Sequence, residues 1–107
     1  KAIHLTKPLG YIDFMSSVYG SRCVITDSGG IQEETSWLGV PCITLRPNTE
    51  RPITITHGTN ILSSADNLKS DIETMFSSPR RKIVDIPLWD GNTAQRCVDS
   101  LVTFFER

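Results

Sequence analysis

The stretch Cys23-Val-Ile-Thr-Asp-Ser-Gly-Gly30 decides the fold of this chain. An apolar run ends in two adjacent glycines, and a segment with helical spacing follows at once and stops at Gly39, with Pro41 just behind it. This order predicts a strand, a tight turn and a helix. In open α/β sheets ligands bind where strands end and helices begin, so the turn is also the first candidate site.

The same pattern recurs on both sides of this stretch. Apolar runs at Ala2 to Leu5 and at Cys42 to Leu45 are bounded by Gly or Pro, and Thr59 to Leu62 can form a further short strand. Segments with helical spacing lie between these runs. The alternation predicts an α/β fold with a parallel sheet of about four strands and flanking helices.

The spacing of apolar residues predicts three more helices. The first ends at Gly20, and another follows Ser63 or Ser64, either of which can cap it. The last begins after Asn92, which we expect to cap it together with Gln95. Its apolar face needs a partner surface and carries Val98, Leu101 and Phe105.

Length and charge narrow the possible function classes. At 107 residues the chain has room for one domain. Eleven basic and twelve acidic residues give a net charge of −1 with no block of one sign, which argues against a nucleic-acid partner. No apolar run approaches the roughly 20 residues of a membrane span, and no signal-peptide pattern opens the chain. We therefore expect a soluble, cytoplasmic protein.

Cysteine and histidine do not indicate a metal centre. Cys23, Cys42 and Cys97 are far apart in apolar segments, which predicts reduced, buried thiols. His4 and His57 have no Cys, His or carboxylate at ligand spacing. The sequence therefore predicts no metal site.

The turn after the second apolar run suits a diphosphate. Gly29 and Gly30 carry no side chains that would keep an anion from the backbone, and the N–H groups of a first helical turn have no partners within the helix. Ser28 adds a hydroxyl donor at the same place. The alternative, of about equal weight on spacing alone, is a plain turn capped by Asp27 or Ser28.

Glu34 favours a nucleotide over a free phosphate. It lies four residues beyond Gly30, about 6 Å deeper along the same face of the helix. A carboxylate would repel a diphosphate, but it can accept hydrogen bonds from the two hydroxyls of the adjoining ribose. We expect its neighbour Glu33 to point elsewhere and to be solvated.

The segment from Arg46 to Gly58 is too long for a minimal connection and is a candidate functional loop. It follows the Cys42 strand, so it leaves the sheet at the same edge as the glycine turn. Arg51 can reach ligand phosphates there, and Glu50 can hold it in position. The alternative is a surface ion pair that contributes almost nothing.

Four motifs together resemble one known family. They are Thr26-Asp-Ser-Gly-Gly-Ile-Gln-Glu-Glu34, Leu38-Gly-Val-Pro41, Leu45-Arg-Pro-Asn-Thr-Glu-Arg-Pro52 and His57-Gly-Thr-Asn60, with Pro87-Leu-Trp-Asp-Gly91 as a closing segment. Their order and spacing are similar to the C-terminal motif series of the non-hydrolysing UDP-N-acetylglucosamine 2-epimerases. The resemblance covers nearly the whole chain and about the last third of a family member.

The resemblance implies a fold and a set of site residues. The family has two Rossmann-like domains of the GT-B type with the nucleotide sugar between them, and residues 1–107 would be the C-terminal diphosphate-binding part without the N-terminal domain. Ser28, Gly29 and Gly30 would hold the diphosphate, Glu34 the ribose, Arg51 the phosphate side and the backbone around Phe14 the uracil. For Phe14, plain packing in the first helix is an equal alternative.

The resemblance also implies an activity. The family interconverts UDP-GlcNAc and UDP-ManNAc by eliminating and re-adding UDP, with no cofactor. Its acid and base residues match no segment here, so we expect no catalytic residue in this chain and no activity from it alone. The implied setting is polysaccharide biosynthesis in the cytoplasm by a homodimer whose final helix packs toward the N-terminal domain.

Three other readings stay open at this stage. A GT-B glycosyltransferase would share the diphosphate site and the ribose carboxylate. A hydrolysing epimerase would share the motifs and differ in its products. A stand-alone nucleotide-binding module would have no reaction at all, and the start of the chain at an apolar run argues against it.

Overall fold

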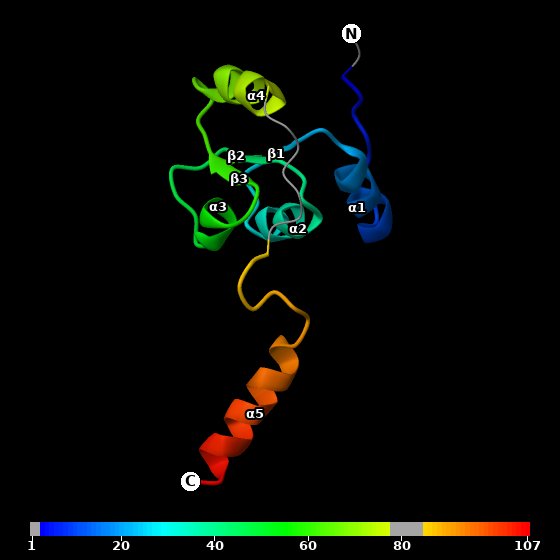
Figure 1. Cartoon of the computed structure of the whole chain (residues 1–107). Helices are drawn as coiled ribbons and strands as arrows, with labels where there is room; N and C mark the ends of the chain where they lie inside the picture. The colour runs from blue at the N-terminus through cyan, green and yellow to red at the C-terminus, as the bar shows by residue number, and fades with distance from the viewer. Residues whose placement is uncertain (1–2, 78–84) are drawn as a thin grey trace.

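The computed structural model describes residues 3–77 and 85–107. These residues form a small parallel sheet with helices packed around it, and a last helix that projects away from the sheet (Figure 1). The elements in chain order are α1 (Tyr11–Gly20), β1 (Val24–Thr26), α2 (Gly30–Leu38), β2 (Cys42–Thr44), α3 (Ile53–Thr56), β3 (Asn60–Leu62), α4 (Leu68–Ser77) and α5 (Thr93–Phe105).

The sheet has the order β1-β2-β3, and both pairings are parallel. Its register places Ile25 beside Ile43 and Ile43 beside Ile61. The connections between neighbouring strands run through α2 and α3, so all three strands end at one edge of the sheet. The predicted α/β fold with a parallel sheet is confirmed, and the candidate residues after β1 and β2 share that edge.

The prediction of a strand at Ala2 to Leu5 is wrong for the residues that are described. Residues 3–5 are not in a strand, and Ile3 and Leu5 are 90% and 94% exposed; Ala2 lies outside the described residues. An extended segment gains stability from a neighbouring strand and from cover on its faces. This one runs from α1 away from the sheet (Figure 1) and has neither. Among the described residues the sheet has three strands.

The core lies between the sheet and α2, and much of it is polar. Val40, Cys42 and Ile43 are fully buried, and so are several uncharged polar side chains of α2, β2, α3 and β3. The buried polar residues are Gln32, Thr35, Ser36, Thr44, Thr54, Thr59 and Asn60. Hydrogen bonds join them, as burial of polar groups requires.

Helix ends differ in part from those predicted. Gly39 closes α2 with φ of 68°, as the sequence predicts, and the Val40 N–H donates to Thr35 O at 2.9 Å. Gly20 ends α1 without a left-handed conformation. Neither Ser63 nor Ser64 directly precedes α4; Asn67 does, and its carbonyl accepts the Asp71 N–H at 3.0 Å. The Ser63 hydroxyl donates instead to the Asp71 carboxylate at 2.5 Å.

α5 begins where predicted but without the predicted side-chain cap. Asn92 is the N-cap residue, yet its own N–H donates to Asp90 Oδ1 at 3.0 Å and its side chain caps nothing. Gln95 donates to Asp99 Oδ1 at 2.8 Å instead of returning to the cap. Arg96 pairs with Asp90 and ties the start of α5 to the preceding turn.

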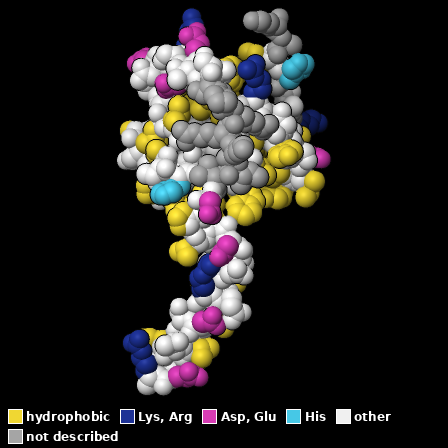
Figure 2. All heavy atoms as spheres, viewed as in Figure 1, with side chains coloured by type: hydrophobic (Ala, Val, Ile, Leu, Met, Phe, Trp, Pro, Cys, Tyr) yellow, Lys and Arg dark blue, Asp and Glu magenta, His cyan; other side chains and the backbone are white. Residues whose placement is uncertain are grey.

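The apolar face of α5 is open to solvent. Leu101 is 56% and Phe105 78% exposed, and none of the residues of this helix is buried. Figure 2 shows hydrophobic side chains along the projecting helix. α1 also buries little, with Val18 as its one buried residue.

The three cysteines are free thiols in different surroundings. Only Cys42 is buried, and burial raises the pKa of its thiol. Cys23 is half-buried and Cys97 is exposed on α5, so the prediction that all three are buried is wrong for Cys97. Among the described residues, no helix is both long enough and apolar enough to cross a membrane.

Candidate functional site

In the turn between β1 and α2, no side chain caps the start of the helix. Gly29 is the N-cap residue, in helical conformation. The Ser28 N–H donates back to Thr26 Oγ1 at 3.0 Å, which tightens the turn. The alternative in which Asp27 or Ser28 caps α2 is therefore not realised, and no side-chain cap occupies the N–H groups of the first turn.

Four of the six candidate residues line one cavity. Phe14, Ser28, Gly30 and Glu34 are part of the wall of a cavity of about 550 Å³ between α1, β1 and the start of α2. Its size falls within the usual range for small-molecule sites. Much of its lining is apolar. Ser28 adds a hydroxyl that can donate a hydrogen bond, and Glu34 adds a carboxylate that can only accept one.

Tyr11 supports Glu34 from the other helix. The Tyr11 hydroxyl donates to Glu34 Oε1 at 3.3 Å, so α1 and α2 share a polar contact through a residue of the cavity wall. Glu34 is half-buried, and its second carboxylate oxygen has no hydrogen bond among the described contacts. The sequence pattern did not single out Tyr11, because on spacing it belongs to an apolar helix face.

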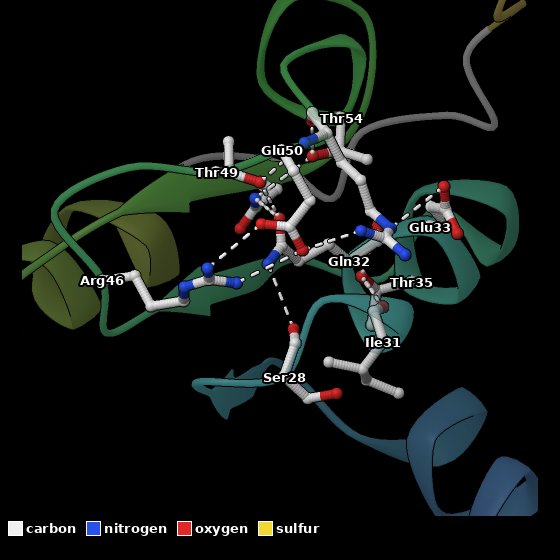
Figure 3. A network of polar contacts seen from close by, with 11 residues as sticks. Ser28, Ile31, Gln32, Glu33, Thr35, Arg46, Thr49, Glu50 and Thr54 are labelled. Carbon is white, nitrogen blue, oxygen red and sulfur yellow. Dashed lines mark hydrogen bonds and ion pairs between the residues drawn. The ribbon is translucent and has the colours of Figure 1, made fainter.

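The other two candidates meet on the far side of the turn. A Cβ placed on Gly29 would lie 3.1 Å from Arg51 Nη1 and 2.5 Å from Glu50 Oε1. The loop after β2 therefore lies directly against the glycine turn (Figure 3). A side chain at position 29 would displace the ends of the Glu50 and Arg51 side chains from this position.

Arg51 is held by two carboxylates. Its Nη1 donates to Glu50 Oε1 at 2.7 Å, as expected, and its Nε lies 3.1 Å from Glu33 Oε1. Glu33 is the predicted first-turn charge and its side chain is 46% exposed, but the expectation that it points elsewhere is wrong, because the loop folds back over the first turn of α2 and brings Arg51 against it. Arg46 Nη2 pairs with the second Glu50 oxygen at 3.0 Å, so two cations and two anions balance.

We call Arg46, Arg51, Glu33 and Glu50 the Arg51 cluster, and their ion pairs are largely open to solvent. The Arg51 side chain is 30% and Glu50 51% exposed, and pairs this exposed contribute little. The Nε–H of Arg51 is buried and, among the described residues, has no aligned acceptor, since its contact with Glu33 lacks hydrogen-bond geometry. The Glu50 backbone N–H and then Arg46 hold the pKa of the Glu50 carboxyl below its ordinary value.

Beneath the turn and the loop lies a buried polar network that sequence reasoning missed. Gln32 Oε1 accepts from Thr49 Oγ1 at 2.7 Å and from Asn60 Nδ2 at 3.0 Å, and its Nε2 donates to Ser28 O at 3.1 Å. The signal was present in the sequence as polar residues at 32, 35 and 36, on the face of α2 that turns to the sheet. Such spacing on a core-facing helix predicts a hydrogen-bonded cluster.

Within residues 3–77 and 85–107 there is no group of three or more His, Cys, Asp or Glu side chains that could hold a metal ion. The donor groups at this edge of the sheet are a hydroxyl, backbone N–H groups and a guanidinium. They suit an anionic ligand with phosphates.

A sequence profile described as UDP-N-acetylglucosamine 2-epimerase matches residues 1–102. The chain belongs to this family. Among the curated relatives of this epimerase family, the UDP-N-acetylglucosamine 2-epimerase of Methanocaldococcus jannaschii is 40% identical over 100 residues, which are 92% of this chain and 27% of the relative. That of Bacillus subtilis is 35% identical over 106 residues, 94% of this chain and 28% of the relative.

Solved structures of epimerases agree with this membership. The M. jannaschii UDP-GlcNAc 2-epimerase in complex with UDP-GlcNAc and UDP superposes with a TM-score of 0.78 at 39% identity, over 92% of this chain and 27% of that one. The Neisseria meningitidis enzyme bound to UDP-GlcNAc gives a TM-score of 0.75 at 32% identity, over 94% and 29%. The chain thus spans little more than a quarter of the length of these relatives, and it matches their C-terminal part.

Proposed function

We propose that this chain binds the UDP part of UDP-N-acetylglucosamine. The observation that carries the proposal is the cavity at the carboxyl edge of the sheet, where Phe14, Ser28, Gly30 and Glu34 meet. It offers an uncapped helix start for phosphates and a carboxylate one turn away for ribose hydroxyls. Both are features of nucleotide sites in open α/β sheets.

Each candidate residue has a role in the proposed complex. The N–H groups at Gly29 and Gly30 and the Ser28 hydroxyl donate to the diphosphate, and the Glu34 carboxylate accepts from the ribose. Arg51 lies against Gly29 and would donate hydrogen bonds to the phosphates from the loop side. The uracil lies near Phe14, which is 43% exposed at the cavity wall.

We further propose that the whole protein interconverts UDP-GlcNAc and UDP-ManNAc. In this reaction the C2 proton is removed and UDP leaves from C1, which gives 2-acetamidoglucal; UDP then adds again and C2 is reprotonated. The donors of this chain would stabilise the departing diphosphate and keep UDP in place for its return. The groups that move the C2 proton would come from outside residues 1–107, in an N-terminal domain of a GT-B pair.

The oligomeric state, the compartment and the pathway are part of the same proposal. A homodimeric, cytoplasmic enzyme of polysaccharide biosynthesis fits the family resemblance. The open apolar face of α5 would pack toward the N-terminal domain, which is the direction implied by the same resemblance. In the polypeptide of residues 1–107 alone, the ligand would have only the contacts that these residues provide, so affinity for UDP would be well below that of the complete site.

Titration calorimetry with UDP on the polypeptide of residues 1–107 tests the binding role. We expect weak binding that becomes weaker in both Ser28→Ala and Glu34→Ala. Thr103→Ala is the matched control, because Thr103 is exposed on α5 and its hydroxyl contacts only Asp99 O of the same helix. Unchanged binding in both site variants would overturn the assignment.

Solvent exchange tests the division of labour. In D₂O, the full-length protein should incorporate deuterium at C2 of UDP-GlcNAc and form UDP-ManNAc, whereas residues 1–107 alone should do neither. Formation of free N-acetylmannosamine and UDP would identify a hydrolysing enzyme instead. Deuterium at C2 with residues 1–107 alone would show that this chain carries its own acid and base.

A further inference from the structure

Gln32 contacts both parts of the proposed diphosphate site, the Ser28–Gly30 turn and the loop that carries Arg51. It lies in the first turn of α2, and its side chain is fully buried. Its Nε2 donates to the carbonyl of Ser28 in the glycine turn, and its Oε1 accepts the hydroxyl of Thr49 in the loop that carries Arg51. Figure 3 shows this amide between the turn and the loop.

The connection continues from Thr49 to Arg51. The backbone N–H of Arg51 donates to Thr49 Oγ1 at 3.0 Å, so the Thr49 hydroxyl donates to Gln32 and accepts from Arg51 at once. A chain of three hydrogen bonds therefore runs from the Ser28 carbonyl to the backbone of Arg51. Loss of the Thr49 hydroxyl breaks two of the three and leaves the Arg51 side chain chemically unchanged.

The orientation of the Gln32 amide is determined by its neighbours. Asn60 Nδ2 donates to Gln32 Oε1 at 3.0 Å, while Asn60 Oδ1 accepts the Thr44 hydroxyl at 2.6 Å. Reversing the Gln32 amide would bring its NH₂ group against the Asn60 NH₂ group, with two donors facing each other. The amide can therefore present only Nε2 to Ser28, which makes it a rigid spacer between turn and loop.

We propose that Gln32 is a positioning residue that, through Thr49, sets the Arg51 loop at the correct distance from the Ser28–Gly30 turn for a diphosphate. This inference rests on the proposed function. Gln32 itself is buried beneath the site and does not contact the ligand. Its effect reaches the ligand through the backbone position of Arg51, so it acts on the diphosphate and not on the nucleoside.

The test uses the full-length protein with Thr49→Val and Thr49→Ser. Valine keeps the shape of threonine without the hydroxyl, and serine keeps the hydroxyl. Thr35→Val is the control: Thr35 is fully buried in the helix that carries Gln32, and its hydroxyl donates to Ile31 O and Gln32 O and contacts the Cys42 thiol, but none of these contacts involves Thr49 or Arg51. Dissociation constants are measured for UDP and, by competition, for uridine, which lacks the phosphates.

We expect Thr49→Val to raise the dissociation constant for UDP about tenfold, which is the scale of one misplaced hydrogen bond to a charged group. The dissociation constant for uridine should change by less than about twofold. Thr49→Ser and Thr35→Val should stay within about twofold of the wild type for both. In an Arg51→Ala background, Thr49→Val should add less than about twofold, because the group that it positions is gone. Thermal unfolding shows whether each variant is folded; if Thr49→Val does not fold, Thr49→Ala carries the same prediction.

The outcomes separate this inference from the function on which it rests. If Arg51→Ala weakens UDP binding and Thr49→Val does not, the positioning role is wrong and the proposed function stands. Equal weakening of UDP and uridine by Thr49→Val would also overturn it, because general damage would then explain the loss. If the wild-type protein does not bind UDP, the proposed function fails and takes this inference with it. If UDP binds and Arg51→Ala has no effect, the proposed role of Arg51 is wrong and this inference fails with it.

Discussion

The Glu50 carboxylate lies directly over Gly29, so close that a Cβ on the glycine would come within 2.5 Å of Glu50 Oε1. Gly29 belongs to the turn after β1 and Glu50 to the loop after β2. The Glu50 carboxylate therefore occupies the space that a side chain at position 29 would need. This contact explains why a glycine at position 29 suits the turn. The backbone angle does not require one, since φ of Gly29 is −71°.

Gly29→Ala should reduce affinity for UDP more than it reduces stability. The atoms that a new methyl group would meet are the ends of the Glu50 and Arg51 side chains, which are partly exposed and can move. We expect the free energy of unfolding to change by less than about 1 kcal/mol and the dissociation constant for UDP to rise about tenfold. Calorimetry and chemical unfolding measure both. A loss of stability above about 2 kcal/mol would show that the cluster is rigid.

Gly58→Ala should show the opposite balance. A Cβ there would lie 2.5 Å from the carbonyl oxygen of Thr54 and 2.8 Å from Cβ of Ser36, and both residues are fully buried. We expect a loss of about 1–3 kcal/mol in the free energy of unfolding, since overpacked cores must shift backbone. Gly10→Ala is the control, because no atom lies within 4 Å of its Cβ position. Similar stabilities of the two variants in urea would contradict the packing at Gly58.

Glu50 should make stability depend on pH in the acid range. Its folded pKa is lowered from 4.5 by its own backbone N–H, by Arg46 and by Arg51, so the folded state favours the carboxylate. Its contribution is present above pH 4.5 and is lost as the pH falls through the lowered folded pKa. Unfolding of the wild type and of Glu50→Gln between pH 7 and 3 should therefore show a difference that shrinks toward low pH. A difference that grows as the pH falls would reverse the sign of this argument.

The open face of α5 should drive association of the polypeptide of residues 1–107. Contiguous exposed apolar side chains favour contact between molecules. We expect Leu101→Glu and Phe105→Glu to lower the apparent mass in light scattering and to leave the unfolding temperature unchanged, because neither side chain is buried. Ser100→Glu, also exposed on α5, is the control for added charge. Association that persists in both apolar variants would assign it to another surface.

Local patterns predicted the elements of this fold well where short-range chemistry decides them. The strands at Val24–Thr26 and Cys42–Thr44, and the end of α2 at Gly39, follow from apolar runs and from a left-handed glycine. Ile3 to Leu5 has the same apolar composition and forms no strand, because pairing and cover come from other parts of a protein. Composition cannot report whether such a neighbour is present.

At the site, the approach of Arg51 to the glycine turn was predictable, because both follow parallel strands and must leave the sheet at one edge. The roles of Glu33 and Gln32 were not. Glu33 meets Arg51 only because the loop folds back over α2, and a loop path is not encoded in residue spacing. The spacing of residues 32, 35 and 36 indicates that Gln32 belongs to a buried polar cluster, but it does not identify the partners of Gln32, which lie 17 and 28 positions further along the chain.

Those separations have a kinetic consequence. The hydrogen bonds of Gln32 close loops of 17 and 28 residues, and the entropy lost in closing a loop must be overcome before such contacts can stabilise anything. We therefore expect the distance between turn and loop to be settled only when β2 and β3 have docked. We expect forms in which these strands have not docked to bind a diphosphate less tightly than the native state. UDP added to a refolding mixture should therefore slow unfolding and leave the folding rate unchanged.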